Sequence, residues 1–544
     1  AWIAREELFL GSDRPQRMIP GIFDRGALMK RFSGFWLAPW VLLAASAPAA
    51  ADVRLPSPFG DHMVLQRDLP IPVWGWADPG EQVTVTLASQ SRTTAADPSG
   101  RWSVRLDPLK AGGPHVLKVQ GRNTIERQDV LVGEVWLCSG QSNMAMTVSG
   151  CLNFQEESKA ADFPGIRMFT AARKTAGEPQ TDVPGEWKVC TPQTVGAFSA
   201  AAYFFGRRIH RELEVPVGLL HSSWGGTPIQ AWTSWKAQEE NAMLVPLLES
   251  FRKAAESWDP EKAKERYEKQ LADWKAAEAK AKEEGKPFKM RRPQAPQDPR
   301  ISPNSPARLY NAMIAPLVPY GIRGAIWYQG EANAGNAALY GYQLRAMIEG
   351  WRKDWSQGDF PFISVQLPNF MALQMKPVEE GWAAIREQFL LSLALPNTGI
   401  AVTIDVGEAE DIHPKNKQDV GFRLAQWALA RTYSKPLVPG GPLYRGMRRD
   451  GASIVLEFDC IGSGLEAKGG EPLKGFAICG PDRNFVWAQA RIVGDTVVVS
   501  SPGVLDPTAV RYAWANNPVC NLANKDGFPA SPFRTDRPEQ NAFK

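Results

Sequence analysis

Residues Val135–Met146, VWLCSGQSNMAM, indicate the fold class of this chain and contain its first candidate catalytic residue. An apolar run ends at Cys138, and small polar residues able to start a helix follow. The stretch predicts a buried strand, a glycine turn and a helix start, with the hydroxyl of Ser142 at the carboxyl end of the strand. Open α/β sheets carry their reactive groups at that edge. A serine that only caps a helix beside a turn glycine would give the same sequence. The two interpretations are distinguished by whether the chain offers catalytic partners for Ser142.

Length and composition narrow the class of protein. A chain of 544 residues predicts about three domains. With 22% charged and 44% hydrophobic residues, the composition is typical of a soluble globular protein. A net charge of +4 over this length provides no basic groove, so we expect no nucleic-acid partner. The 20 tryptophans indicate core and interface packing, with stacking on sugar rings as the alternative.

Residues 1–51 are expected to be an upstream extension followed by a signal peptide. Met29-Lys30-Arg31 is a basic start, Phe35–Ala45 is a short apolar core, and small residues follow up to Ala51. The apolar core is too short to remain in a bilayer, so we expect no stable membrane insertion. Cleavage near Ala51 predicts a periplasmic or extracellular protein.

Export would permit disulfide bonds between the six cysteines. Their spacing contains no C-x-x-C pair, so we expect no metal site. Cys151 with Cys190, and one pair among the last three cysteines, are possible bridges. Sequence alone leaves the pairing open.

The pattern along the chain predicts three regions after residue 51. Residues 52–130 show short alternating runs separated by glycine and proline turns, which predicts an N-terminal β-sandwich-like module. Residues 131–434 alternate apolar runs with helical patterns such as Ala200–Leu213 and Tyr340–Trp355, which predicts a doubly wound α/β catalytic domain. Residues 435–544 return to β patterning, which predicts a C-terminal β-sandwich-like module. The expected parallel strands are Val132–Cys138, Val215–Ser222, Gly324–Tyr328, Phe360–Gln366 and Gly399–Ile404.

An insertion at about residues 236–300 interrupts the α/β pattern. It is rich in Glu, Ala and Lys, with many oppositely charged residues four positions apart. We interpret it as a solvated helical hairpin or a single long helix, followed by a proline-rich loop.

The five histidines make the search for a partner of Ser142 short. His413 is the best candidate, because it follows the last expected parallel strand and therefore lies at the same sheet edge as Ser142. Asp411 stands two residues before it and can hold the imidazole tautomer. Asp405 and Glu410 are nearby acids, so the identity of the orienting carboxylate stays open.

Two further polar loops belong to the same edge. Ser222–Thr227, SSWGGT, follows the second expected strand, and its paired glycines allow backbone N–H groups close to a bound group. Gln329–Asn333, QGEAN, follows the third and offers amide and carboxylate groups. Together with Ser142 and His413, they predict four polar loops at one rim.

This set of motifs resembles the sialate O-acetylesterase family within the GDSL-like (SGNH) hydrolases. The similarity covers nearly all of residues 53–537, and its blocks occur in the family's order. The blocks are Gly140-Gln141-Ser142-Asn143-Met144, Trp224-Gly225-Gly226-Thr227-Pro228, Trp327–Asn333, Asp411-Ile412-His413-Pro414, Asn516-Asn517-Pro518 and Pro529–Thr535.

The resemblance implies a fold and a set of roles. It implies a flavodoxin-like α/β/α SGNH-hydrolase domain with a five-stranded parallel sheet, flanked by the two β modules. It implies Ser142 as nucleophile, His413 as general base and then acid, and Asp411 as its orienting carboxylate. Gly226 and Asn333 would hold the oxyanion with the N–H of Ser142, and no metal or other cofactor is implied. The residues left as possible substrate or rim contacts are Gln141, Gln329 and Glu331.

One feature departs from the wider superfamily. Its usual acid–base block is Asp-x-x-His, whereas Asp411 is two residues before His413 and Glu410 is three. The expected reaction is removal of O-acetyl groups from carbohydrates, either sialic acid or an acetylated polysaccharide, through an acetyl-serine intermediate. The alternatives are an exported glycan-binding protein without catalysis and a serine hydrolase that acts on other acyl esters.

Overall fold

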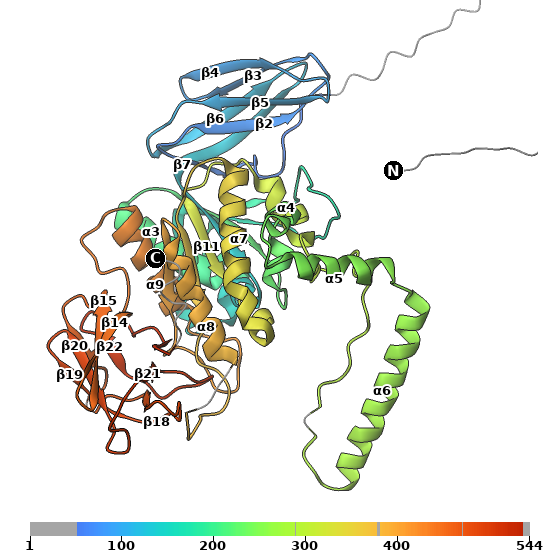
Figure 1. Cartoon of the computed structure of the whole chain (residues 1–544). Helices are drawn as coiled ribbons and strands as arrows, with labels where there is room; N and C mark the ends of the chain where they lie inside the picture. The colour runs from blue at the N-terminus through green and yellow to red at the C-terminus, as the bar shows by residue number, and fades with distance from the viewer. Residues whose placement is uncertain (1–51, 289, 378–380, 471, 537–544) are drawn as a thin grey trace, which may run out of the picture. The chain divides into compact units, whose positions relative to one another are not determined.

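The computed structural model describes residues 52–536, except 289, 378–380 and 471 (Figure 1). The upstream extension and the signal peptide expected within residues 1–51 lie outside the described residues. Across the described ranges, no helix combines the length and apolar content that a membrane crossing needs.

The central strand β7 (Thr124–Gly140) passes through two sheet environments. Its first part alternates between exposed and partly buried residues and pairs antiparallel with β6 (Gly112–Gln120). From Val130 onward every residue is buried. The strand pairs in parallel with β10 (Val217–Ser223) from Glu134 and with β11 (Gly324–Tyr328) from Trp136. Continuous burial is expected where a parallel strand is covered on both faces. The boundary expected after residue 130 therefore falls inside one continuous strand.

The central part of the sheet has the order β13-β12-β11-β7-β10-β8-β9, within a mixed sheet of 11 strands. All neighbours in this order are parallel except β8 and β9. The five expected strands all lie in this path, in the chain order 2-1-3-4-5. Strand β8 is a sixth parallel strand beside β10, so the parallel part is larger than the five strands expected. The sequence pattern did not predict β8, because its Pro164 and Gly165 suggest a turn. The remaining strands are β8 (Phe163–Thr170), β9 (Trp187–Cys190), β12 (Phe362–Gln366) and β13 (Thr398–Val402).

Four longer helices accompany the parallel strands. Helix α3 (Ala200–Leu213) occupies the expected segment and packs against α9 (Lys417–Trp427) and β10. Helix α7 (Ala337–Trp355) begins before the expected Tyr340 and packs against α8 (Gly381–Leu391). Strands β10 to β13 are buried over almost their whole length, as expected for a sheet covered on both faces.

The N-terminal region consists of short strands joined by tight turns. Strand β2 pairs antiparallel with β5, and β3 pairs antiparallel with β4 and β6. One expected turn is closed by Asp97, whose Oδ1 accepts the N–H groups of Ser99 (2.8 Å) and Arg101 (3.0 Å). The strands are β1 (Val64–Gln66), β2 (Ile71–Trp76), β3 (Gln82–Leu87), β4 (Gln90–Ala95) and β5 (Arg101–Leu106).

The C-terminal region has an apolar core of its own, which includes Leu456, Ile478 and Phe533. One sheet has the order β14-β15-β20-β19, another has the order β18-β17-β21-β23, and β16 pairs with β22. The strands are β14 (Leu443–Asp450), β15 (Ser453–Asp459), β16 (Leu465–Ala467), β17 (Phe476–Cys479), β18 (Val486–Trp487), β19 (Gln489–Val493), β20 (Thr496–Ser500), β21 (Ala509–Tyr512), β22 (Leu522–Asn524) and β23 (Phe533–Arg534).

Buried arginines tie this region to helix α8. The Arg386 guanidinium is fully buried and donates to the carbonyl oxygens of Ala515 (2.7 Å) and Asn516 (2.8 Å). Arg534 forms a buried ion pair with Glu387, with N–O distances of 2.8 and 2.9 Å. Buried charges are tolerated when their hydrogen bonds are satisfied.

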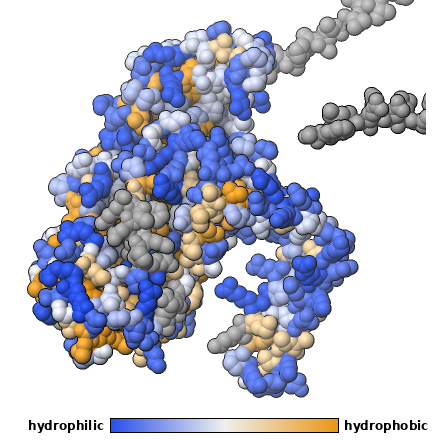
Figure 2. All heavy atoms as spheres, viewed as in Figure 1, coloured by the Kyte–Doolittle hydropathy of each residue, from blue (hydrophilic) through white to orange (hydrophobic). Residues whose placement is uncertain are grey.

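The charged insertion folds as helices. Helix α4 (Trp235–Glu239) is followed by α5 (Val245–Glu256) and the long α6 (Pro260–Glu283). No residue of α6 is buried, and Figure 2 shows a mainly hydrophilic surface over the insertion. Helix α6 is therefore solvated, as the charge pattern predicts, and it is a single long helix rather than half of a packed helical hairpin.

The structure answers the question of cysteine pairing that the sequence leaves open. All six are free thiols in the structure, including Cys151 and Cys190, which the sequence analysis considered as a pair. The Cys151 Sγ atom instead contacts the carbonyl oxygen of Leu152 (3.3 Å), and the Cys190 Sγ atom contacts that of Ala161 (3.8 Å).

A buried carboxylate joins three parts of the chain at β7. Glu134 is 0% exposed, and its carboxylate lies 2.5 Å from Arg67 Nε and 2.8 Å from Arg323 Nε. The Tyr433 hydroxyl donates to the same carboxylate at 2.9 Å. The two ion pairs and this hydrogen bond link the N-terminal region, the central sheet and the segment after α9.

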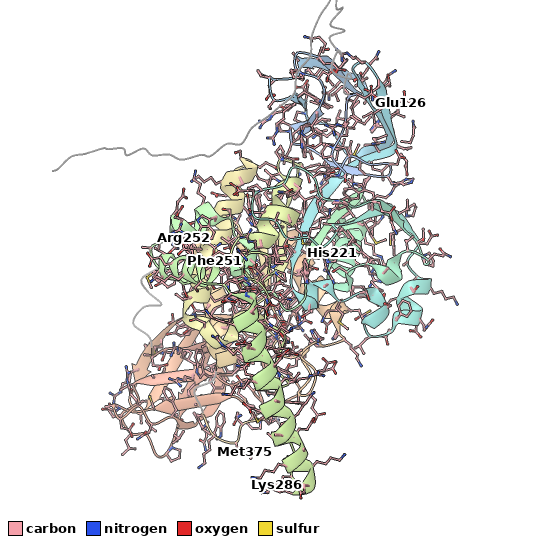
Figure 3. The ribbon with its side chains drawn as sticks, turned by 90° about the vertical axis from the view of Figure 1, so that its right-hand side faces the viewer. Glu126, His221, Phe251, Arg252, Lys286 and Met375 are labelled. Carbon is pink, nitrogen blue, oxygen red and sulfur yellow. The ribbon has the colours of Figure 1, made fainter. Side chains whose placement is uncertain are left out.

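We expect Glu134→Gln to destabilise the fold by about 2–4 kcal/mol, because two partly buried guanidinium groups lose their counter-charge. The measurement is the free energy of unfolding in urea. Glu126→Gln is the matched control, since Glu126 is an exposed glutamate on the same strand (Figure 3), and its change should stay within about 0.5 kcal/mol. Equal unfolding midpoints for the two variants would contradict the structural role of the Glu134 ion pairs.

Candidate active site

Ser142 follows a turn that requires glycine. Gly140, the last residue of β7, has φ +145°, and a Cβ atom there would lie 2.1 Å from the Tyr328 carbonyl oxygen of β11. The N–H of Gln141 donates to the same carbonyl at 3.0 Å. The chain then enters the short helix α1 (Ser142–Ala145), so the expected order of strand, turn and helix is present.

His413 brings an imidazole to this serine from the loop after β13. Its Nε2 atom lies 2.9 Å from Ser142 Oγ, across 271 residues of sequence. The His413 side chain is 42% exposed, so a substrate can reach the pair. An imidazole in this position can accept the serine proton and later return it to a leaving group.

Asp411 lies near the imidazole without hydrogen bonding to it. Its Oδ1 atom is 3.7 Å from His413 Nδ1 and instead accepts the backbone N–H of His413 at 2.8 Å. Asp405 is bound to Arg423, with N–O distances of 2.5 and 3.0 Å. Although burial opposes ionisation, the Arg423 hydrogen bonds keep the pKa of Asp405 below its usual value. Glu410 is exposed to solvent, whereas Asp411 is in contact with His413.

The glycine loop after β10 comes directly against Ser142. A Cβ atom on Gly225 would lie 3.3 Å from Ser142 Cβ. The N–H of Trp224 donates to the Gly140 carbonyl at 3.1 Å and holds the loop beside the turn. Gly226 has φ +75°, a conformation that favours glycine. The loop therefore carries backbone N–H groups past the serine.

Asn333 lies in a cluster of buried amides. Its Nδ2 donates to the side-chain oxygens of Gln230 and Gln343, each at 3.2 Å. Its Oδ1 accepts the N–H of Ile229 (3.0 Å) and Nε2 of Gln329 (2.7 Å). Both amide hydrogens of Asn333 therefore have acceptors within the protein, and its oxygen holds the segment that follows Gly226.

The three residues left as possible substrate or rim contacts are instead largely buried. Gln141 is 3% exposed, and its side-chain oxygen accepts the N–H of Ala332 at 3.4 Å. Gln329 is 0% exposed and donates to the Thr227 carbonyl at 3.2 Å. Glu331 has a buried carboxylate, and burial raises its pKa. These side chains connect loops below the surface, which explains why they do not form the rim.

Two functional candidates were missed from the sequence. Asn143 is 0% exposed, and its Nδ2 donates to Glu331 Oε1 (2.6 Å) and to the Ile412 carbonyl (3.0 Å). Lys417 is also 0% exposed and donates to Asn143 Oδ1 at 2.8 Å. A lysine in a charged loop normally indicates solvent exposure, so the sequence carried no signal of its burial. The position of Asn143 beside Ser142 was the available clue for that residue.

The loop after β13 is also tied to the C-terminal region. Asn369 Oδ1 accepts the N–H of Gly407 (2.7 Å), and Met371 N–H donates to the Ala409 carbonyl (2.9 Å). Asn517 in turn accepts from Asn369 Nδ2 (2.9 Å) and donates to the Met371 carbonyl (2.6 Å). The asparagine block near the C-terminus therefore supports the loop that carries His413.

A second serine–histidine pair is closed to substrate. His221 is labelled in Figure 3, and its Nε2 atom lies 2.6 Å from Ser223 Oγ. His221 and Ser223 are only 6% and 3% exposed. Burial, with the nearby Arg173, lowers the pKa of His221 to about 4 and keeps it neutral. Within the described residues, no group of three or more His, Cys, Asp or Glu side chains could hold a metal ion.

Comparison with known proteins supports the chemistry of this site. A family model described as carbohydrate esterase, sialic acid-specific acetylesterase, matches residues 132–282 and 300–430. The chain is 32% identical to sialate O-acetylesterase of Rattus norvegicus, covering 91% of this chain and 96% of that protein. It is 31% identical to the Mus musculus protein of the same name, covering 92% and 97%. A crystal structure of a carbohydrate acetylesterase from Xanthomonas citri is 38% identical, with a TM-score of 0.75, over 89% of this chain and 100% of that one.

The mixed α/β fold, the accessible serine–histidine pair and these matches define a carboxylic ester hydrolase. The chain belongs to the sialic acid-specific acetylesterase family of carbohydrate esterases. The break in the family match, between residues 282 and 300, falls at the end of the charged insertion.

We expect Gly225→Ala to lower kcat/KM for ester hydrolysis by about 10-fold, because the new Cβ would force Ser142 or its loop to shift. The measurement is hydrolysis of p-nitrophenyl acetate by the folded variant. Gly503→Ala is the control, since a Cβ atom there meets nothing within 4 Å. Unchanged kcat/KM in Gly225→Ala would mean that this loop tolerates displacement without effect on the reaction.

Proposed function

We propose that the protein is a serine esterase that removes O-acetyl groups from carbohydrates through an acetyl-serine intermediate. The observation that carries the proposal is the 2.9 Å contact between Ser142 Oγ and His413 Nε2, beside the Gly225-Gly226 loop. The names of the relatives indicate that the substrate is an acetylated carbohydrate, and membership of the family indicates that the reaction is ester hydrolysis.

In the proposed mechanism, Ser142 Oγ attacks the acetyl carbonyl carbon while His413 Nε2 takes the hydroxyl proton. The tetrahedral intermediate then collapses, the bond between the acetyl carbon and the sugar oxygen breaks, and that oxygen takes the proton from His413. Water, deprotonated by the same imidazole, attacks the acetyl-serine. Acetate leaves, and Ser142 regains its proton from His413.

The oxyanion of each tetrahedral intermediate is proposed to accept the backbone N–H groups of Ser142 and Gly226. The approach of the glycine loop to Ser142 supports this assignment. Asn333 is proposed as a third donor, and it reaches the oxyanion only if the contact with Gln230 or Gln343 opens. In the resting arrangement, Asn333 contributes by holding Ile229, three residues after Gly226.

Asp411 is proposed to stabilise the imidazolium that forms at His413. The distance of 3.7 Å between Asp411 Oδ1 and His413 Nδ1 supports an electrostatic effect without a direct hydrogen bond. The same oxygen also restrains the backbone of His413.

We expect Asp411→Asn to lower kcat by about 10-fold, because the amide oxygen can still accept the His413 N–H while the negative charge is lost. Steady-state kinetics with an acetylated sugar provides the measurement. Glu410→Gln removes the exposed neighbouring charge and should leave kcat unchanged. If Asp411→Asn retained the parent kcat, the carboxylate would have no role in stabilising the imidazolium.

The substrate is proposed to be an O-acetylated carbohydrate, either a sialic acid or an acetylated polysaccharide. Two alternatives are distinguished by experiment: a glycan-binding protein without catalysis, and a serine hydrolase that acts on longer acyl esters. Release of acetate from a panel of acetylated glycans, compared with release of butyrate from matched esters, separates the proposed activity from both alternatives.

We expect Ser142→Ala to lose at least about 10³-fold in acetate release and to lose covalent labelling by a fluorophosphonate probe. The serine would no longer supply the attacking oxygen. Ser223→Ala is the matched control, because Ser223 belongs to the buried second pair, and this variant should still be labelled. Acetate release at the parent rate by Ser142→Ala would overturn the proposed function.

The proposed architecture is an SGNH-hydrolase domain of flavodoxin type over residues 131–434, between β-sandwich-like modules at 52–130 and 435–544. The strand order 2-1-3-4-5 supports the first assignment, and the separate C-terminal core supports the last. Export is proposed on the basic, apolar and small-residue segments between Met29 and Ala51. N-terminal sequencing of the mature protein would test cleavage near Ala51.

A further inference from the structure

A lysine and a glutamate carry buried charges directly behind Ser142. Lys417, the first residue of α9, is fully buried, and its ammonium group donates to Asn143 Oδ1 (2.8 Å) and to the Pro414 carbonyl. Glu331 accepts Asn143 Nδ2 at 2.6 Å through Oε1, while its Oε2 is buried without a hydrogen-bond partner among the described residues. Asn143 therefore stands between the cation and the anion.

The two charges fix the orientation of the Asn143 amide. Its oxygen accepts from the Lys417 ammonium, and its NH2 group donates to the Glu331 carboxylate. A flipped amide would turn its NH2 group to the ammonium and its oxygen to the carboxylate, so both contacts would be lost. The orientation of this neutral side chain is thus set by electrostatics on two sides.

The oriented groups hold the peptide on both sides of His413. Asn143 Nδ2 donates to the Ile412 carbonyl at 3.0 Å, and Lys417 Nζ donates to the Pro414 carbonyl. These are the residues immediately before and after His413. Because Asn143 is also the residue after Ser142, one amide connects the serine turn to the histidine loop.

This support matters because no carboxylate among the described residues accepts a hydrogen bond from the imidazole. Asp411 Oδ1 is 3.7 Å from His413 Nδ1, and the histidine side chain is 42% exposed. The ring position therefore depends on how firmly the backbone of the loop is held. A displacement near 1 Å in a reacting group can cost about 100-fold in rate.

We propose that Lys417, Asn143 and Glu331 form a positioning unit that holds His413 against Ser142, with Lys417 as its key residue. The proposal rests on the proposed function, since it assigns no reaction of its own. None of the three side chains touches the reacting atoms, so each acts through the position of the serine turn or the histidine loop.

Burial opposes the charged form of both ionisable groups in the unit. Burial lowers the pKa of Lys417 to about 8, although Glu331 and Asp411 oppose the shift, and burial raises the pKa of Glu331. Buried ionised groups of this kind add little to stability compared with apolar residues of similar size. Their hydrogen bonds to the carbonyls that flank His413 instead supply a defined geometry.

The test uses three variants of the full chain. Lys417→Met removes the donors at similar side-chain length but leaves Glu331 without its nearby cation. The double variant Lys417→Met/Glu331→Gln removes both charges and still lacks the donor to Pro414. Lys415→Met is the matched control, because Lys415 is an exposed lysine in the same loop.

The readouts are kcat and KM for an acetylated sugar and the rate of fluorophosphonate labelling at Ser142. In the single and double variants we expect kcat to fall by about 10- to 100-fold, with KM within about 2-fold of the parent. Labelling should slow by a similar factor, since it needs the Ser142–His413 geometry but no sugar. Lys415→Met should match the parent in all three measurements.

Three results would overturn the positioning role. The first is parent-like kcat in the folded Lys417→Met protein. The second is unchanged labelling in a variant whose kcat has fallen. The third is failure of Lys417→Met to fold while the double variant recovers full kcat, because Lys417 would then only compensate the charge of Glu331. Failure of the proposed function is separate, since it appears as activity in Ser142→Ala.

Discussion

The close approach of β7 and β11 at Gly140 is the constraint on which the rest of the site depends. A side chain at this position would collide with the Tyr328 carbonyl, and the following peptide is held by donating to that same oxygen. The direction in which the chain leaves β7 is thereby fixed. Strand β11 continues into the segment with Gln329 and Asn333, so one backbone contact sets the relative place of the serine and the amide cluster.

The protein uses buried charge in two different ways. At Glu134, the carboxylate and two guanidinium groups are in direct contact, and their attraction joins separate parts of the chain. Behind Ser142, the charges of Lys417 and Glu331 are separated by Asn143. In direct contact, each charge is compensated by a charge of opposite sign. Where an amide lies between the two charges, they instead fix which way its oxygen and its NH2 group point.

The sequence predicted those features that have a local pattern. Apolar runs marked five of the parallel strands, and a glycine turn followed by a small polar helix start marked Ser142. It did not predict strand β8, whose Pro164 and Gly165 suggest a turn although the parallel contact with β10 places it in the sheet. Nor could it predict that Lys417 is buried, because that depends on residues more than 80 positions away in the chain.

The contact of Asn517 with the Asn369–Met371 loop joins residues that are synthesised at different times, and Asn517 is made last. A chain leaves the ribosome N-terminus first, at about 5–20 residues per second. Ser142 therefore emerges on the order of tens of seconds before the asparagines that support the histidine loop. The histidine loop can gain this support only after residue 517 has been made, so a chain truncated before it would carry the serine without a fully supported histidine.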